Sequence, residues 1–195
     1  MLLIGSSALA WLSLQSRPQT EIYQSARLFP QPRPIEPFRL VDQHGQPFTP
    51  ERLTGQWNLL FFGYTHCPDV CPDTLARTAQ AIRMLEQDGQ PKPSVWFISV
   101  DPERDEPQRL ADYVHYFHED FHAATGKPAQ LEAFSRSLAA IYFIGEPDEN
   151  GHYDVDHSAN LLILDPRGRL AGMFRPPFDP QAMAWDLQKL QEEGS

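Results

Sequence analysis

The apolar residues of this chain fall into two kinds of pattern. In segments 57–63 and 94–100 they form nearly continuous runs, as expected of strands that are buried on both faces. Between these runs, residues 75–85 carry apolar side chains at helical spacing, which predicts an amphipathic helix of about four turns. This strand–helix–strand order predicts two parallel strands that are joined by a helical crossover.

The remaining apolar patterns extend this arrangement to the end of the chain. They predict helices at 108–118, 130–138 and 180–192, and strands at 140–144, 160–164 and 170–174. A turn of sequence DPRG at 165–168 joins the last two strands into a hairpin. Residues 38–47 predict a further hairpin as an N-terminal extension. The predicted fold class is therefore α/β, with a mixed central sheet flanked by helices.

The segments before this domain have a different composition. Residues 1–14 are apolar and uncharged, although a membrane-spanning helix needs about 20 residues and a signal peptide has a basic start. We interpret residues 1–16 as a membrane anchor or uncleaved signal, with a frayed core helix as the alternative. An anchor would place the rest of the chain outside the cytoplasm, on the periplasmic face of a bacterial inner membrane. Residues 17–35 are rich in proline and predict a semi-rigid linker or a disordered tail, and residues 36–195 form the globular domain.

Charge and cysteine content exclude several classes of function. Lys and Arg number 16 and Asp and Glu 26, which gives a net charge of −10. We expect no nucleic-acid partner, because phosphate contacts require a basic surface. The chain has two cysteines, too few for a disulfide-stapled scaffold or for a four-cysteine zinc or iron–sulfur site within one chain. The two thiols must therefore act as a local pair.

Cys67 and Cys71 form this pair, in the loop between the strand at 57–63 and the helix that follows. The loop lies at the carboxyl edge of the predicted sheet, where open α/β sheets place their chemistry. The N-terminus of the helix favours thiolate over thiol. Residues four apart on a helix have Cβ atoms about 5–6 Å apart, which is further than a disulfide prefers. The spacing permits soft-metal binding as well as redox cycling, and an inert pair or plain disulfide is the alternative.

A metal held by two cysteines needs a third ligand, and the chain has seven histidines. His157 is a candidate, because a loop that enters the strand at 160–164 can bring its imidazole to the cysteine edge. Asp156 would orient that ring. We expect His66 to point away from the cysteines. We expect His115, His118 and His122 to form a cluster on the surface, so these four histidines should not contribute a ligand. Spacing alone leaves the third ligand open.

Three sequence blocks carry a resemblance to a known family. They are GYTHCPDVCP at 63–72, SVDPERD at 99–105 and VDHS at 155–158. With this order and spacing, which cover nearly all of residues 36–190, the chain resembles the Sco/SenC family of copper-handling proteins. The resemblance implies a thioredoxin-like fold, an N-terminal membrane anchor, and copper, as Cu(I) or Cu(II), bound by Cys67, Cys71 and His157.

The same resemblance implies a function and partners. It implies a copper metallochaperone, rather than an enzyme, that delivers copper to the CuA site of subunit II of cytochrome c oxidase. An upstream copper donor or thiol reductant would be a second partner. The alternative is a thioredoxin-like thiol–disulfide oxidoreductase that acts on the cysteines of that subunit through Cys67 and Cys71, and a copper or redox sensor is a third hypothesis. We expect Asp101, Arg104 and Asp105 to order their loop by ion pairing, with contacts to a partner protein as the alternative.

Overall fold

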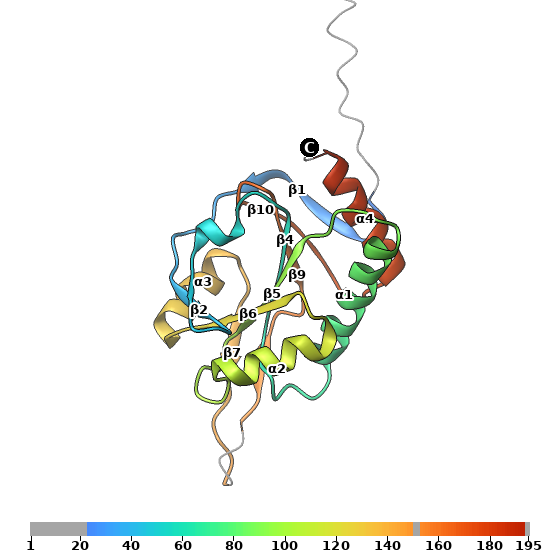
Figure 1. Ribbon diagram of the computed structural model, residues 1–195. Coiled ribbons are helices and arrows are strands. Elements are labelled where there is room, and N and C mark those ends of the chain that lie inside the picture. The colour runs from blue at the N-terminus through green and yellow to red at the C-terminus, as the bar shows by residue number, and fades with distance from the viewer. Residues whose placement is uncertain (1–22, 150–152, 194–195) are drawn as a thin grey trace, which may run out of the picture.

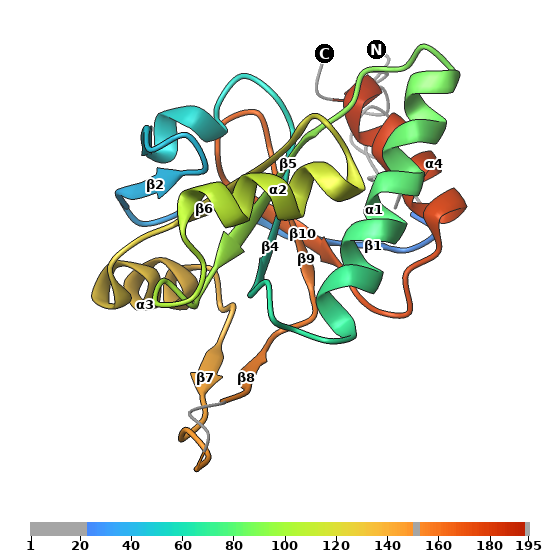
Figure 2. The same cartoon turned by 60° about the horizontal axis from the view of Figure 1, so that its bottom comes forward.

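The computed structural model describes residues 23–149 and 153–193. Its main sheet has eight strands, in the order β1-β10-β9-β4-β5-β6-β2-β3, with helices on both faces (Figure 1). The strands are β1 (Ala26–Arg33), β2 (Leu40–Asp42), β3 (Pro47–Phe48), β4 (Asn58–Gly63), β5 (Ser94–Ser99), β6 (Phe121–Thr125), β9 (Leu161–Leu164) and β10 (Leu170–Phe174). The α-helices are α1 (Val70–Gln87), α2 (Pro107–Phe117), α3 (Pro128–Ser137) and α4 (Pro180–Glu193). A separate hairpin of β7 (Tyr142–Ile144) and β8 (Val155–His157) projects from one end (Figure 2).

The middle of the sheet contains the predicted crossover. β4 and β5 are parallel, with Phe61 opposite Phe97, and α1 connects them. β6 continues the parallel set beside β5, while β9 and β10 add antiparallel strands on the other side of β4. Every residue of β4 is buried, which explains its continuous apolar run. The sheet is mixed, and the predicted α/β fold class is confirmed.

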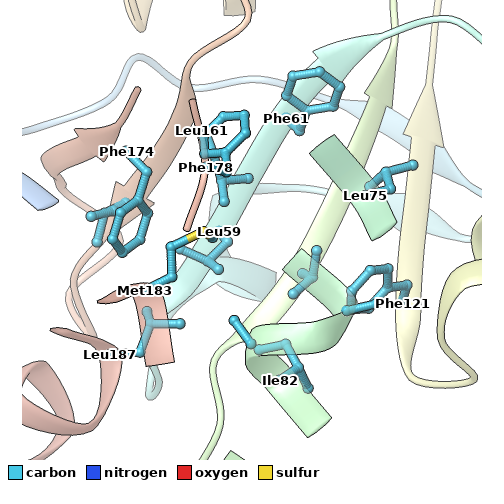
Figure 3. Close-up of a cluster of buried hydrophobic side chains, with 14 of the residues drawn as sticks. Leu59, Phe61, Leu75, Ile82, Phe121, Leu161, Phe174, Phe178, Met183 and Leu187 are labelled. Carbon is cyan, nitrogen blue, oxygen red and sulfur yellow. The ribbon is translucent and has the colours of Figure 1, made fainter. Parts of the chain in front are cut away.

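Two apolar cores lie on the two faces of the sheet. Because side chains alternate along a strand, Leu59 and Phe61 of β4 point to one face and Leu60 and Phe62 to the other. The first face is covered by α1, α2 and α4, and Figure 3 shows part of this core. The second is covered by α3 and the 3₁₀ helix Pro50–Leu53. Since both cores contain residues of β4, the carboxyl end of this strand is held firmly.

Some strands differ from the sequence-based expectation. Residues 26–33, which the proline content placed in a linker, form β1 and pair with β10 at the edge of the sheet. The prolines do not prevent this pairing, because Pro30 and Pro32 lie where the register shifts between Leu28 and Arg33. β6 and β8 were not predicted, because their sequences FHAAT and VDH lack an apolar run. The linker prediction was therefore wrong for residues 26–33.

A buried carboxylate joins the beginning of the described chain to the last helix. Asp186 of α4 accepts hydrogen bonds at 2.7 Å from the backbone N–H groups of Gln24, Ser25 and Ala26, and one at 3.0 Å from Ser25 Oγ. Several N–H groups aimed at one carboxylate form an anion-binding nest. The segment that leads into β1 is thus fixed on α4, away from the projecting hairpin (Figures 1 and 2).

Among the described residues, no helix has the length and apolar character needed to cross a membrane. The predicted anchor, residues 1–16, and the first part of the predicted linker lie outside the described residues.

Replacement of the buried carboxylate tests the attachment of β1. We expect Asp186→Asn to lower the free energy of unfolding by about 2–3 kcal/mol, because the amide cannot accept all the hydrogen bonds that converge on the carboxylate. Urea denaturation measures this change. Glu192→Gln, on the exposed side of the same helix, is the control and should change the stability by less than about 0.5 kcal/mol. Equal stability of both variants would contradict the role assigned to Asp186.

Candidate metal centre

The two cysteines lie where β4 ends and α1 begins. The loop after Gly63 turns with a hydrogen bond from the Cys67 N–H to the Tyr64 carbonyl (3.2 Å), and Cys71 is the second residue of α1. The Cys71 N–H points back to Cys67 Sγ, at 3.4 Å. Cys71 is fully buried and Cys67 is partly exposed, and neither forms a disulfide. The predicted position at the carboxyl edge of the sheet is confirmed.

Gly63 leaves the space that the Cys71 sulfur occupies. A Cβ atom at position 63 would lie 2.6 Å from Cys71 Sγ and 2.8 Å from Phe97 Cε2. Both distances are far shorter than a van der Waals contact. The sulfur therefore reaches the end of β4 because this strand ends in a residue without a side chain.

His157 comes to the cysteines from the projecting hairpin. Its Nε2 atom lies 3.2 Å from Cys71 Sγ, and the ligand atoms of Cys67, Cys71 and His157 all lie within 4.8 Å of one another. The rings of Phe61 and Tyr64 meet the imidazole edge to face, with centroids 5.6 and 6.1 Å away. The structure thus brings together the three residues that the family resemblance singled out.

The backbone, rather than Asp156, orients the imidazole. His157 Nδ1 lies 3.2 Å from the Ser158 carbonyl oxygen. Because a carbonyl only accepts, Nδ1 donates a hydrogen to it, and Nε2 is the ring nitrogen that faces the sulfurs. Asp156 is exposed, since neighbouring residues of a strand point to opposite faces. The expectation that Asp156 orients the ring was therefore wrong.

The two cysteines differ in acidity, so that one proton of the pair stays on Cys71. The pKa of Cys67 is lowered to about 4, first by the hydrogen bond from the Cys71 thiol and then by the backbone N–H groups of Asp69 and Cys71, which together outweigh the effect of burial. The pKa of Cys71 is raised, because its thiol donates to the Cys67 sulfur and because it is buried. Cys67 is therefore the thiolate, on the accessible side of the pair.

The loop after β5 fastens the histidine-bearing hairpin. Arg104 forms an ion pair with the buried Asp101, and its guanidinium lies 3.6 Å above the centre of the Tyr153 ring. Arg104 Nη1 also donates to the Tyr153 carbonyl (3.2 Å), while the Tyr153 hydroxyl donates to Asp101 Oδ1 (2.7 Å). The predicted ion pair is confirmed. Tyr153, which sequence reasoning missed, connects it to the strand that carries His157.

The second carboxylate of this loop fixes the cysteine segment. Asp105 is fully buried and accepts hydrogen bonds from the Thr65 N–H (2.9 Å), the Thr65 hydroxyl (2.5 Å) and the Ser99 hydroxyl (2.6 Å). Its role is hydrogen bonding rather than the ion pair with a cation that we expected. Thr65 precedes Cys67 by two positions, so Asp105 determines where the cysteine loop starts. Only the block at 99–105 hints at this in the sequence.

No other histidine of the described residues belongs to the group of Cys67, Cys71 and His157. His66 is exposed, with Nδ1 3.8 Å from Asp105. His115 is exposed as expected, but His118 is buried, stacks on Phe121 and lies 3.3 Å from Glu86. α2 ends at residue 117, so His118 leaves the helical face of His115 and turns inward. The prediction of a surface cluster was wrong for His118.

The inequality of the two thiols is testable by alkylation. In the reduced, folded protein we expect iodoacetamide to modify Cys67 at least about tenfold faster than Cys71, because thiolates react and Cys71 is neutral and buried. Peptide mass spectrometry after short reaction times measures both rates. The two cysteines should react similarly in urea, where their environments are lost. Similar rates in the folded state would contradict the assignment of the thiolate.

Comparisons with known proteins agree with this architecture. The solved structure of ScoI from Arabidopsis thaliana, with copper bound, superposes with a TM-score of 0.76 and 33% sequence identity, covering 82% of this chain and 98% of that chain. The predicted thioredoxin-like fold is therefore confirmed.

The matches to sequence relatives cover a smaller share of each relative's length than the structural match does. A Stutzerimonas stutzeri protein with copper binding in its name is 39% identical over 150 residues, which are 77% of this chain and 73% of that protein. The mouse protein SCO2 homolog, mitochondrial, is 42% identical over 132 residues, which are 67% of this chain but 52% of that protein. This chain therefore spans about half the length of its mouse relative. The sequence model of the SCO1/SenC family matches residues 29–192. The chain therefore belongs to the SCO1/SenC family.

Proposed function

We propose that this protein is a copper metallochaperone that binds one copper ion through Cys67, Cys71 and His157 and delivers it to the CuA site of cytochrome c oxidase subunit II. The observation that carries the proposal is the convergence of two sulfurs and one imidazole nitrogen within 4.8 Å. Copper in the name of the Stutzerimonas relative and in the Arabidopsis structure supports the choice of metal. The oxidase as acceptor rests on the resemblance to the family.

The donor set suits Cu(I). Two thiolates and one neutral imidazole are soft ligands that favour monovalent copper, whereas structural zinc requires a fourth ligand. Within the described residues, the group that contains the cysteines has three members. A three-coordinate ion leaves one side open to an acceptor thiolate, on the side of the partly exposed Cys67. Copper would then pass by ligand exchange without release into solution.

The N-terminal predictions belong to the same proposal. Residues 1–16 would anchor the protein to a membrane, with the domain outside the cytoplasm on the periplasmic face. The nest around Asp186 supports this arrangement, because it fixes residues 24–26 away from the hairpin that carries His157. The copper ligands would then face away from the attachment point.

A second candidate function uses the same sulfurs. An accessible thiolate beside a buried thiol is the arrangement of an attacking and a resolving cysteine. As an oxidoreductase, Cys67 would attack a disulfide of the oxidase subunit, and Cys71 would release it as a dithiol. Cys67 and Cys71 would become the disulfide, and a thiol reductant would restore them. This chemistry does not use His157, which separates it from copper binding.

An anaerobic Cu(I) titration of the reduced full chain, against a competing chelator, tests the proposed site. We expect one tightly bound copper per chain, and a loss of affinity of more than about 100-fold in His157→Ala, because a ligand is lost. His66→Ala, an exposed histidine next to Cys67, is the matched control and should bind as the unaltered protein does. Undiminished affinity of His157→Ala would remove His157 from the site. Weak copper binding together with disulfide reduction that survives this substitution would favour the oxidoreductase.

Because Arg104 fastens the hairpin that carries His157, its replacement should weaken copper binding through the position of His157. We expect Arg104→Leu to weaken Cu(I) binding by about 10- to 100-fold, because the hairpin loses its attachment to the loop after β5. Arg175→Leu, an exposed arginine elsewhere, should have no effect.

A double variant separates positioning from general damage. If Arg104 acts by positioning His157, adding Arg104→Leu to His157→Ala should weaken copper binding little beyond the single His157→Ala variant. Additive losses would show that Arg104 acts on the cysteines or on overall stability instead.

A further inference from the structure

The hairpin that carries His157 exposes large apolar side chains. Ile141, Phe143 and Ile144 are 73%, 68% and 42% exposed. They lie within four consecutive residues, although the strands of the main sheet bury most of their apolar residues. Exposure of contiguous apolar surface is unfavourable in water and marks a contact surface. The hairpin projects from the molecule (Figures 1 and 2), so this surface is accessible.

A groove separates this hairpin from α3. Its volume is ≈ 470 Å³, and it is lined by Glu132, Ser135 and Arg136 of α3 and by residues 141–144. This volume falls in the range of ligand-binding clefts. We call this cleft, together with the exposed side chains of Ile141, Phe143 and Ile144, the hairpin groove. The hairpin groove adjoins the group of Cys67, Cys71 and His157, because Tyr142 of β7 pairs directly with His157 of β8.

One edge of β7 is open. The Ser158 N–H donates to the Ile141 carbonyl and the Gly145 N–H to the Asp154 carbonyl, so the odd-numbered residues of this segment bond to β8. In an antiparallel pair the intervening residues then direct their N–H and C=O groups outward. Those of Tyr142 and Ile144 have no backbone partner within the described residues. An open edge of this kind accepts an additional strand.

The charge of the hairpin selects the kind of partner. Five exposed carboxylates lie on it, those of Glu146, Asp148, Glu149, Asp154 and Asp156. Residues 137–166 contain no Lys or Arg. Such a surface attracts a basic partner and repels a second copy of itself.

We propose that the hairpin groove docks an extended segment of the protein that accepts the copper, with apolar side chains flanked by Lys or Arg. The segment adds to the open edge of β7 as a strand, and its apolar side chains cover Ile141 and Phe143. It then lies two strands from His157, which brings the accepting thiols of the partner near Cys67. This inference rests on the proposed function, because the occupant is the copper acceptor.

Copper transfer to the acceptor tests the groove separately from copper binding. The full chain, loaded with Cu(I), is mixed with the reduced, copper-free soluble domain of oxidase subunit II from the same organism. We expect the double variant Ile141→Ser/Phe143→Ser to bind Cu(I) as the unaltered protein does, yet to transfer it at least about tenfold more slowly at limiting acceptor concentration. Tyr116→Ser is the matched control, because Tyr116 of α2 is 84% exposed and lies outside the groove.

Two further measurements probe the backbone edge and the charge. Ile144→Pro removes an outward N–H while leaving the bonds to β8, so it should slow transfer more than Ile144→Ser. The transfer rate of the unaltered protein should fall as salt is added, because salt screens the attraction between the carboxylates and a basic partner.

The outcomes distinguish the groove from the proposed function. If the unaltered protein transfers copper and the double variant does so equally fast, the groove is not the docking site and the proposed function stands. If the unaltered protein binds copper but transfers none to the subunit II domain, the proposed delivery fails and the groove proposal fails with it. A dimer of the unaltered chain that the double variant abolishes, seen by sedimentation, would make a second copy the occupant and overturn the proposal.

Discussion

Two buried carboxylates in the loop after β5 hold the two segments that bring Cys67, Cys71 and His157 together. Asp105 accepts hydrogen bonds from the cysteine loop, and Asp101 binds the Arg104 and Tyr153 side chains that fasten the hairpin. Because Cys71 and the histidine are 86 positions apart in the chain, neither segment determines the position of the other by itself. Buried carboxylates in turn require full hydrogen bonding. The positions of the cysteines and of His157 therefore depend on the two carboxylates, and the carboxylates can stay buried only because these segments supply their hydrogen bonds.

The unequal sulfur pair has the same charge before and after binding monovalent copper. With Cys67 as thiolate and Cys71 as thiol, the pair carries one negative charge. Under the proposed function, Cu(I) replaces the shared proton, and two thiolates with one monovalent cation again carry one negative charge. Cu(II) would instead leave the two thiolates and the ion with no net charge, so the two oxidation states differ in the charge that they bury beside Cys71.

Features that depend on neighbouring residues in the chain could be predicted from the sequence, whereas features that depend on contacts between distant segments could not. The runs at 57–63 and 94–100 predicted the central strands, because burial on both faces leaves a local apolar signal, and the position of the cysteines followed from the crossover. β1 was missed because its partner β10 lies far away in the chain and its prolines dominate the local pattern. The spacing of residues alone does not identify His157 as the third member of the group, since nothing local encodes how a hairpin reaches the sheet edge. Tyr153 left no sequence signal, because its partners belong to another loop.

The prolines of the main sheet have a consequence for how copies of this chain meet. Both outer strands of the eight-stranded sheet contain proline, with Pro30 and Pro32 in β1 and Pro47 in β3. Proline has no N–H to donate, so these edges are poor templates for pairing between molecules. β7, with the sequence YFI, has no proline. The prolines therefore disfavour end-to-end growth of the main sheet through its outer strands, and the edge that stays open to a strand from another protein is that of β7, beside His157.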